Sequence, residues 1–297
     1  MRVLSFGEIL WDIIEHKYYI GGAPFNFASH ISRCGADTYM VSRLGKDIWG
    51  EKAYEEAKKL GIHPDFIQWD ADKPTGTVDV FLNNGQPSYI INPKVAYDYL
   101  DFEELIEAGL QNKSFDMFGF GSLAQRNETS RKCLYRILES LSFEHIFYDV
   151  NLRKDCFSAE IVNESLKYST ILKLNDDEVP IISEFAFSKK MGIEDFCEKV
   201  SAERGQNIII VTAGGDGCFI YHEDKLHKVP GKKVEVVDTV GAGDSFSAAF
   251  LAIYFKKRDP IYAASVANQL GAFVASSHGP IPEYSNELKK VLEIDQA

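Results

Sequence analysis

Residues 234–255, VEVVDTVGAGDSFSAAFLAIYF, contain the strongest structural signal in the sequence. A run of β-branched residues leads into two glycines, Gly241 and Gly243, and a strongly helical segment expected over 245–257 follows at once. Glycines allow the backbone to turn tightly, while the free N–H groups and the positive dipole end of a helix attract a negatively charged group. This stretch therefore predicts an anion-binding site at the start of a helix.

Asp244 follows the glycine turn directly. A carboxylate beside an anion site is electrostatically unfavourable unless it has a role there, and accepting a hydroxyl proton during phosphoryl transfer is such a role. Capping the helix is the alternative, because aspartate is a favoured N-cap residue. The local motif leaves both interpretations open.

Outward from this turn, short apolar β-rich runs alternate with helical patterns. The alternation predicts right-handed β-α-β units, a mainly parallel sheet covered on both faces, and ligands at the carboxyl ends of the strands. No internal repeat or linker divides the chain, so one α/β domain over 1–297 is expected. The expected strands are 3–6, 38–42, 117–120, 145–149, 171–174, 208–212 and 218–221, and the expected helices are 26–33, 49–60, 131–141, 193–203 and 245–257.

Residues 75–92, TGTVDVFLNNGQPSYIIN, depart from the alternation. They predict a hairpin, because Asn84 and Gly85 form a strong turn signal between two strand-like runs. The strand-like segment 11–20 is expected to pair with this hairpin. Together the two segments would form a flap that projects from the main sheet.

Composition narrows the class of partner. The chain has 32 Lys and Arg against 44 Asp and Glu, a formal charge of −12, and it shows no basic patch. A nucleic-acid or anionic-membrane partner is therefore not expected, and a small molecule is. Five scattered cysteines without a C-x-x-C pair favour the reducing cytoplasm.

Two apolar stretches could be mistaken for membrane segments. Glu8 and Asp12 interrupt the N-terminal run, which a signal peptide would not tolerate, so this run is expected to supply the first core strand. The uncharged stretch 260–282 contains polar residues and two prolines, so we expect a buried helix that ends in a loop.

Two N-terminal positions could bind a sugar. Gly21 and Gly22 precede a helix with Asn26 on its first turn, and an amide side chain offers the donors and the acceptor that sugar hydroxyls require. A plain helix start is the alternative. Asp12, expected at the end of the first strand, could accept hydrogen bonds from two hydroxyls or face solvent.

Two polar segments follow apolar strands in the middle of the chain. Asn175 and Glu178 are three residues apart, so they could share one face of a helical turn and bind hydrated Mg²⁺ through water. Arg153 could neutralise developing phosphoryl charge. Isolated residues of these types more often form surface pairs. No G-x-x-x-x-G-K-[ST] motif is present, so a nucleotide must be held without a P-loop.

The sequence resembles the PfkB (ribokinase-like) carbohydrate kinases over nearly the whole chain, and within them it is most similar to bacterial fructokinases. This resemblance implies a ribokinase-like three-layer α/β sandwich with a mainly parallel central sheet and a small β-lid formed by about 11–20 and 75–92. The segments that carry it occur in the family's order: FGEILWD, GGAPFNFA, GKDIWG, TGTVDV, GSLAQR, DVNLR, NDDE, VTAGGDG and DTVGAGDSF.

The resemblance also implies a reaction, the ATP-dependent transfer of the γ-phosphoryl group to a sugar hydroxymethyl. Asp244 would be the base, the N–H groups of the glycine turn would form the anion hole, and unpaired lid edges would allow a homodimer. By resemblance, the catalytic residues are Asp244, Gly241, Ala242, Gly243 and Arg153; the sugar contacts are Asp12, Gly22, Asn26 and Gln125; the ATP contacts are Asn175, Thr212, Gly214, Gly217 and Asn268; Glu178 organises Mg²⁺; and Asp238, Val240 and Gly279 bind a monovalent cation such as K⁺.

The identity of the sugar stays open at this stage. D-fructose is favoured over 2-keto-3-deoxygluconate, because no Lys or Arg lies within 75–93 and Asp79 would repel a carboxylate. A ribokinase is a further alternative, and an adenosine-type nucleoside kinase would be expected to have a more hydrophobic lid. A non-catalytic sugar sensor on the same fold is disfavoured because Asp244 and its glycines are intact.

Overall fold

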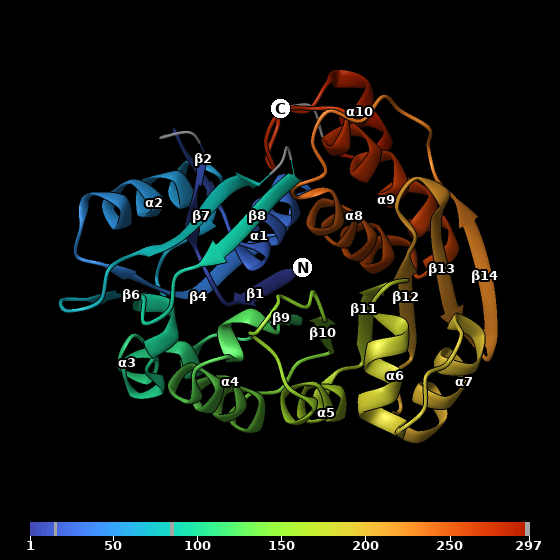
Figure 1. The fold of residues 1–297 in the computed structure, drawn as a ribbon, viewed down its shortest axis with the longest axis horizontal. Helices are drawn as coiled ribbons and strands as arrows, with labels where there is room; N and C mark the ends of the chain where they lie inside the picture. The colour runs from blue at the N-terminus through green and yellow to red at the C-terminus, as the bar shows by residue number, and fades with distance from the viewer. Residues whose placement is uncertain (15–16, 84–85, 295–297) are drawn as a thin grey trace.

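The computed structural model describes residues 1–14, 17–83 and 86–294, which form a sheet of ten strands between two layers of helices (Figure 1). The strand order is β14-β13-β12-β11-β10-β9-β1-β4-β5, and β6 pairs with β4. All pairings from β12 to β5 are parallel, whereas β13 pairs antiparallel with both of its neighbours, β12 and β14. The predicted α/β fold is confirmed. The strands are β1 Arg2–Phe6, β4 Asp37–Gly45, β5 Ile62–His63, β6 Ile67–Asp70, β9 Met117–Gly121, β10 His145–Asp149, β11 Ile171–Asn175, β12 Ile208–Thr212, β13 Gly217–His222 and β14 Lys225–Pro230.

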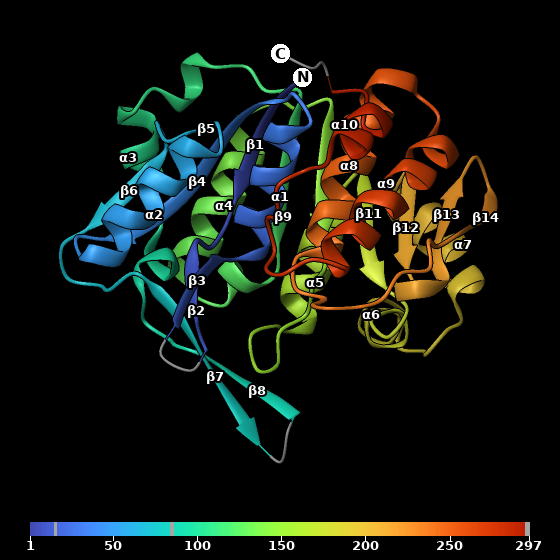
Figure 2. The same ribbon diagram turned by 90° about the horizontal axis from the view of Figure 1, so that it is seen from above.

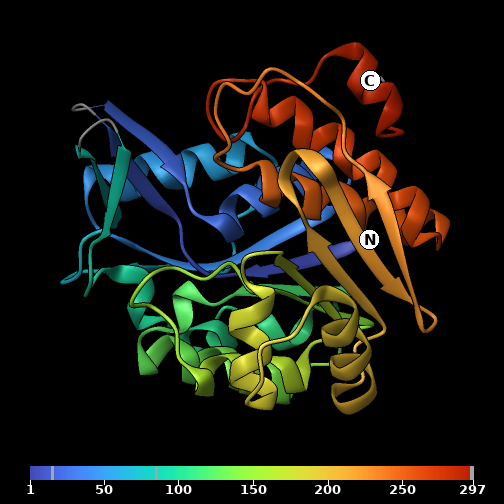
Figure 3. The same ribbon diagram turned by 45° about the vertical axis from the view of Figure 1, so that its right-hand side comes forward.

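Helices cover both faces of this sheet, and Figure 3 shows the orange and red helices above it and the green and yellow helices below it. Val3 and Leu4 are neighbours in β1 but belong to different core clusters, because successive side chains of a strand point to opposite faces. The core is therefore split into two layers by the sheet. The helices are α1 Ala23–Arg33, α2 Ile48–Lys59, α3 Phe102–Glu107, α4 Glu128–Ser140, α5 Ala159–Tyr168, α6 Val179–Phe187, α7 Ile193–Arg204, α8 Ala242–Lys257, α9 Pro260–Ala275 and α10 Asn286–Val291.

All seven expected strands and all five expected helices are present in the described residues, with ends that differ by a few positions. The expected buried helix within 260–282 is confirmed as α9, whose N-terminal N–H groups are capped by Asp259. The sequence analysis missed β5, β6, β14 and several helices. In β14 most side chains are exposed, so the apolar pattern that signals a strand is absent.

The lid is a separate four-stranded sheet made of β2 Leu10–Ile14, β3 Lys17–Gly21, β7 Gly76–Asn83 and β8 Gln86–Ile91. Its order is β3-β2-β7-β8, so the expected pairing of the two segments is confirmed. The predicted turn at Asn84 and Gly85 lies outside the described residues. Figure 2 shows β7 and β8 projecting beyond the edge at which the parallel strands end.

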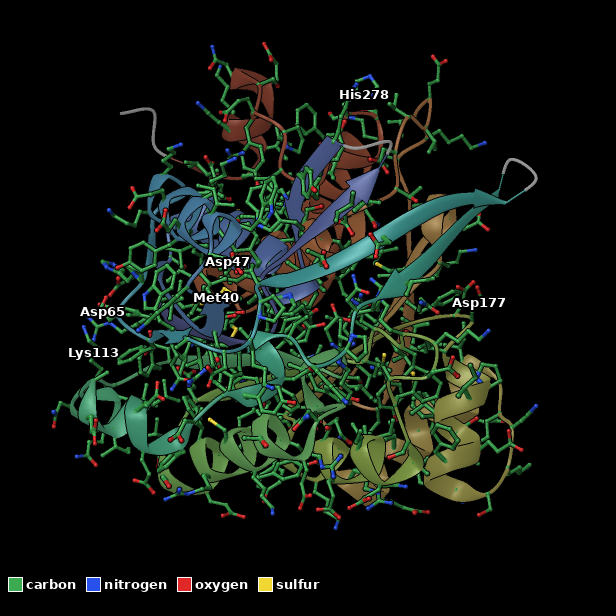
Figure 4. All side chains as sticks on the ribbon, turned by 60° about the vertical axis from the view of Figure 1, so that its left-hand side comes forward. Met40, Asp47, Asp65, Lys113, Asp177 and His278 are labelled. Atoms are coloured by element: carbon green, nitrogen blue, oxygen red, sulfur yellow. The ribbon has the colours of Figure 1, made fainter. Side chains whose placement is uncertain are left out.

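Asp47 fixes the point at which the lid leaves the body (Figure 4). One carboxylate oxygen caps α2 by accepting from the N–H groups of Trp49 and Gly50, and the other accepts from the N–H of Thr75 at 2.8 Å. These three charge-assisted hydrogen bonds hold Thr75, the residue that precedes the lid strand β7, against the start of α2.

One expectation about the lid is wrong. Asp12 was expected at the end of the first strand, but β1 ends at Phe6 and Asp12 lies in the middle of β2. The chain turns between these strands and enters the lid, so Asp12 belongs to the lid sheet and not to the edge of the central sheet. No helix in the described part of the chain is both long and apolar enough to cross a membrane.

Candidate active site

The glycine turn lies at the N-terminus of α8, where Gly241 is the N-cap with φ 78°. A β-carbon at this position would lie 2.6 Å from the β-carbon of Pro280, so both the conformation and the space require glycine. The N–H of Ala242 donates to the carbonyl of Thr239 at 3.2 Å. Among the described residues, the N–H groups of Gly241 and Gly243 have no such partner. The turn therefore presents two free amides to a ligand, fewer than the three expected.

Asp244 is not a helix cap. Gly241 occupies the cap position, and the Asp244 carboxylate instead accepts a hydrogen bond from Nδ2 of Asn26, at 2.9 Å. Only 9% of Asp244 is exposed. Burial raises its pKa to about 6, with a further contribution from the negative charge of Asp149. A buried carboxylate with a raised pKa, held by a helix more than 200 residues away in the chain, has the properties of a general base.

Asn26 enters the site from α1. Gly22 is the N-cap of that helix with φ 108°, and a β-carbon there would lie 2.5 Å from the carbonyl oxygen of Glu8, so glycine is again required. The Asn26 side chain is buried, and Nδ2 is engaged with Asp244. Oδ1 is buried without a hydrogen-bond partner in the described part of the molecule. Such an atom needs a donor, which a ligand hydroxyl can supply.

An acidic cluster of Glu8, Asp12 and Asp244 lies near the exposed side chain of Arg153, whose charge acts on all three carboxyl groups. Burial raises the pKa of Glu8 to about 7 and that of Asp12 to about 6, and the positive charge of Arg153 opposes the shift at both. Arg153 also lowers the pKa of Asp244. Three of the predicted site residues, Asp12, Asp244 and Arg153, therefore lie close enough for their charges to interact. Glu8 was not identified as a site residue, because its only signal was a charge within an apolar run.

A cavity opens beside this cluster, between the start of α1 and the carboxyl ends of β9 and β10. Its apolar wall includes Phe27, Phe120 and Phe147, and its polar wall includes Glu8 and Asp149. Site residues and cavity therefore lie at the strand ends, where α/β sheets bind ligands.

A buried ion pair lies beneath the glycine turn and was missed by the sequence analysis. Lys173 Nζ donates to both carboxylate oxygens of Asp149, at 2.9 and 3.1 Å. Lys173 is the one charged residue in the otherwise apolar run 171–174, and Asp149 ends the preceding expected strand. That pattern could have indicated the pair.

The proposed nucleotide residues gather at the neighbouring strand ends. Asn175 and Thr212 are register partners at the ends of β11 and β12, and Gly214 and Gly217 lie in the following turn. Asn268 on α9 donates its side-chain N–H to the carbonyl oxygen of Pro230 at 3.1 Å. It therefore supports the end of β14 and leaves Oδ1 as its group for a ligand.

Asn175 and Glu178 form a reciprocal cap at the start of α6. Asn175 Oδ1 accepts from the N–H of Glu178 at 2.9 Å, and the Glu178 carboxylate accepts from the N–H groups of Asn175 and Leu152 at 2.8 and 2.7 Å. Burial raises the pKa of Glu178. Each carboxylate oxygen keeps a second lone pair, so this donor set fits a hydrated Mg²⁺ that it contacts through water.

The remaining cation candidates lie near the glycine turn. Asp238 accepts from the N–H of Val240 at 3.0 Å, and Gly279 precedes Pro280, which packs against Gly241. Within the described ranges, no group of three or more His, Cys, Asp or Glu is placed to hold a metal ion. A cation here would depend on backbone carbonyls.

The expected sugar contact of Gln125 is corrected by the structure. Gln125 is fully buried, and its amide nitrogen donates to the carbonyl of Gly121 and the hydroxyl of Ser165. Its amide oxygen accepts from the hydroxyls of Tyr135 and Ser165. The side chain joins β9 to α5 inside the core, so it is not retained as a sugar contact.

A mainly parallel sheet between two helical layers, a four-stranded lid, and a base beside a glycine turn define a ribokinase-like α/β kinase fold. Residues 4–286 match the model of the pfkB family of carbohydrate kinases, and the chain belongs to this family.

Relatives agree with this assignment. Fructokinase-2 of Oryza sativa is 27% identical, with 94% of this chain and 90% of that protein covered. An uncharacterised sugar kinase from Pyrococcus horikoshii, whose structure was solved in complex with ATP, is 26% identical in sequence to this chain. The two structures match with a TM-score of 0.84 over 98% of this chain and 99% of the other. A Xylella fastidiosa fructokinase with bound ATP has a TM-score of 0.85 at 20% identity, covering 99% and 97% of the two chains, and it shows the shared fold.

Proposed function

We propose that this carbohydrate kinase transfers the γ-phosphoryl group of ATP to a hydroxymethyl group of a neutral sugar, D-fructose. The observation that carries the proposal is the position of Asp244, buried beside the two free amides of the glycine turn and held there by Asn26. The ATP complex of the Pyrococcus relative supports the choice of nucleotide.

In this mechanism Asp244 accepts the proton of the sugar hydroxyl. Its pKa of about 6 leaves it ionised at neutral pH but more basic than an ordinary aspartate. The N–H groups of Gly241 and Gly243, with the dipole of α8, stabilise the negative charge of the transferred group. Arg153 neutralises charge from the opposite side. When bound, Mg²⁺ screens the phosphate charges, and Glu178 and Asn175 would hold its water shell.

The sugar would lie between α1 and the lid. A sugar hydroxyl would donate to Oδ1 of Asn26, the buried acceptor that has no partner in the described residues. The Asp12 carboxylate on β2 would accept from two further hydroxyls, and Gly22 would allow close approach to the start of α1. ATP would lie along Asn175, Thr212, Gly214 and Gly217, with Asn268 toward the base or ribose. K⁺ would bind near Asp238, Val240 and Gly279.

The charge of the site favours a neutral sugar over a keto acid. Arg153 is the cation a substrate carboxylate would need, but its charge acts on three carboxyl groups of the protein, those of Glu8, Asp12 and Asp244. The local charge is therefore negative, and a further carboxylate would be repelled. The similarity to rice fructokinase-2 supports fructose within the neutral sugars.

A coupled assay of ADP release tests this function on fructose, ribose, tagatose, 2-keto-3-deoxygluconate and adenosine. We expect the highest kcat/KM on fructose. A preference for 2-keto-3-deoxygluconate would reject the neutral-sugar assignment, and the absence of sugar-dependent ADP release on all five would reject the activity.

The lid is the proposed dimer contact. Tyr18 and Tyr19 on β3 and Ile90 on β8 are each at least 40% exposed. These strands lie at the two edges of the lid sheet, where backbone groups are free to pair with another chain. Sedimentation of the protein and of Tyr19→Lys tests this contact, since a charge at the edge should favour the monomer.

A further inference from the structure

Lys173 places a positive charge directly against the anion site. It is the register partner of Asp149 in the parallel pairing of β10 and β11. Only 8% of its side chain is exposed. A β-carbon built on Gly243 would lie 3.3 Å from Lys173 Nζ. The ammonium group therefore contacts the first turn of α8, beside the glycine turn.

The ammonium group of Lys173 adds to the positive potential at the start of α8. The N-terminus of α8 carries a positive partial charge, so the ammonium and the helix repel each other. Burial by itself lowers the pKa of Lys173, but nearby carboxylates, Asp149 first, outweigh it and raise the pKa, so the group is charged. Asp149 accepts two of the three ammonium hydrogens. The third has no acceptor within the described residues, and an anion at the turn would satisfy it.

We propose that Lys173 is a further catalytic residue, whose ammonium contacts the transferred phosphoryl group; this rests on the function proposed above. In the reaction, the sugar oxygen forms a bond to the γ-phosphorus, and the bond from that phosphorus to the bridging oxygen breaks. Its electron pair stays on ADP, and the hydroxyl proton goes to Asp244. A fixed ammonium stabilises the negative oxygens during this step. Asp149 is the positioning residue that holds it.

The rival explanation is that Lys173 only neutralises Asp149, and a double variant separates the two. Lys173→Met alone leaves a buried unpaired carboxylate, which is destabilising by itself. The double variant Asp149→Asn/Lys173→Met removes both charges and keeps both side chains close to their original size. The measurements are kcat by ADP release on the best sugar of the panel, binding of that sugar by calorimetry, and binding of MgADP with and without fluoroaluminate, a mimic of the transferred group.

If the ammonium acts on the phosphoryl group, the double variant loses about 100-fold or more in kcat, as for loss of one transition-state donor. Its affinities for sugar and MgADP stay near wild type, while the gain in affinity from fluoroaluminate is lost. Recovery of kcat to within about fivefold of wild type would overturn the proposal, because neutralising Asp149 would then be the whole role.

Two controls keep the outcome interpretable. Asp149→Asn alone keeps the ammonium, so it should lower kcat less than Lys173→Met; equal losses would contradict the proposal even if the double variant did not fold. Asp244→Asn is measured in the same assay. An active Asp244→Asn enzyme would reject the proposed base, whereas an inactive one with a recovered double variant would reject only the role of Lys173.

Discussion

The sheet edge and the lid differ in how firmly their polar and exposed side chains are held before substrate binds. At the sheet edge, Asp244, Lys173 and Asp149 are buried, and each is hydrogen-bonded to another protein side chain. In the lid, Tyr19 and Ile90 are about half exposed, whereas Asp12 is partly buried and its carboxyl group is influenced by the charge of Arg153. Under the proposed mechanism, the charges of the reaction are therefore preorganised in the body, and part of the sugar contact is supplied by the lid. Variants in the body should therefore lower kcat, and variants in the lid should raise KM.

The largest expected effect is that of Asp244→Asn. The amide keeps the shape and can still contact Asn26, but it cannot accept the hydroxyl proton. We expect kcat to fall by about 10³-fold, within the range for loss of a general base, with sugar binding nearly unchanged. The measurement is steady-state ADP release together with calorimetric sugar binding. Near-normal turnover would show that the proton leaves by another route, and it would contradict the catalytic role assigned to the body.

Asp12→Asn tests the proposal that the lid contributes to sugar binding. Weakening its hydrogen bonds to two sugar hydroxyls should raise the KM for the sugar by about 10- to 100-fold, since bonds to a charged group contribute about 1.5–3 kcal/mol each. Because Asp12 does not touch the phosphoryl group, kcat should change much less.

The matched control for that variant is Asp79→Asn in the same sheet. Its register partner is Ile13, the neighbour of Asp12, so Asp79 points to the opposite face of the lid sheet and, contrary to the expectation from the sequence, not toward the sugar. Its carboxylate accepts a hydrogen bond from the side chain of Asn92 at 2.9 Å, within the lid itself. It should leave KM within a few-fold of wild type. A larger effect at Asp79 than at Asp12 would place the sugar elsewhere under the lid.

The sequence predicted the sheet edge better than the side chains that meet there. The individual strands and helices, the glycine turn and the position of Asp244 beside it follow from local patterns, because hydrophobic periodicity, glycine conformation and helix termini are local properties. The direction of a side chain depends on packing partners far along the chain. The family resemblance therefore assigned Gln125 to the sugar although it bonds Ser165 in the core, and Lys173 was overlooked although its register partner is Asp149.

The smallest expected effect on activity lies at His30, in the body but away from the reacting groups. Its ring is buried between the carbonyl of Pro280, to which Nε2 donates, and the hydroxyl of Tyr284, from which the neutral Nδ1 accepts. This contact fastens α1 to the loop that packs on Gly241. His30→Gln can reproduce both hydrogen bonds, so kcat at neutral pH should stay within a few-fold of wild type.

The same variant should change how stability depends on pH. Burial, with the nearby charge of Arg33, lowers the pKa of His30 from 6.5 to about 4, although the Pro280 carbonyl opposes this shift. Between these values the unfolded chain binds a proton that the folded protein does not, so stability falls as pH drops from 6.5 toward 4. The loss from this group approaches about 3 kcal/mol, at 1.36 kcal/mol per pKa unit. Urea unfolding should therefore show that the free energy of unfolding falls less between pH 7 and pH 4 in His30→Gln than in wild type. If it falls equally in both proteins, His30 is charged in the folded protein and its contact with Pro280 survives protonation.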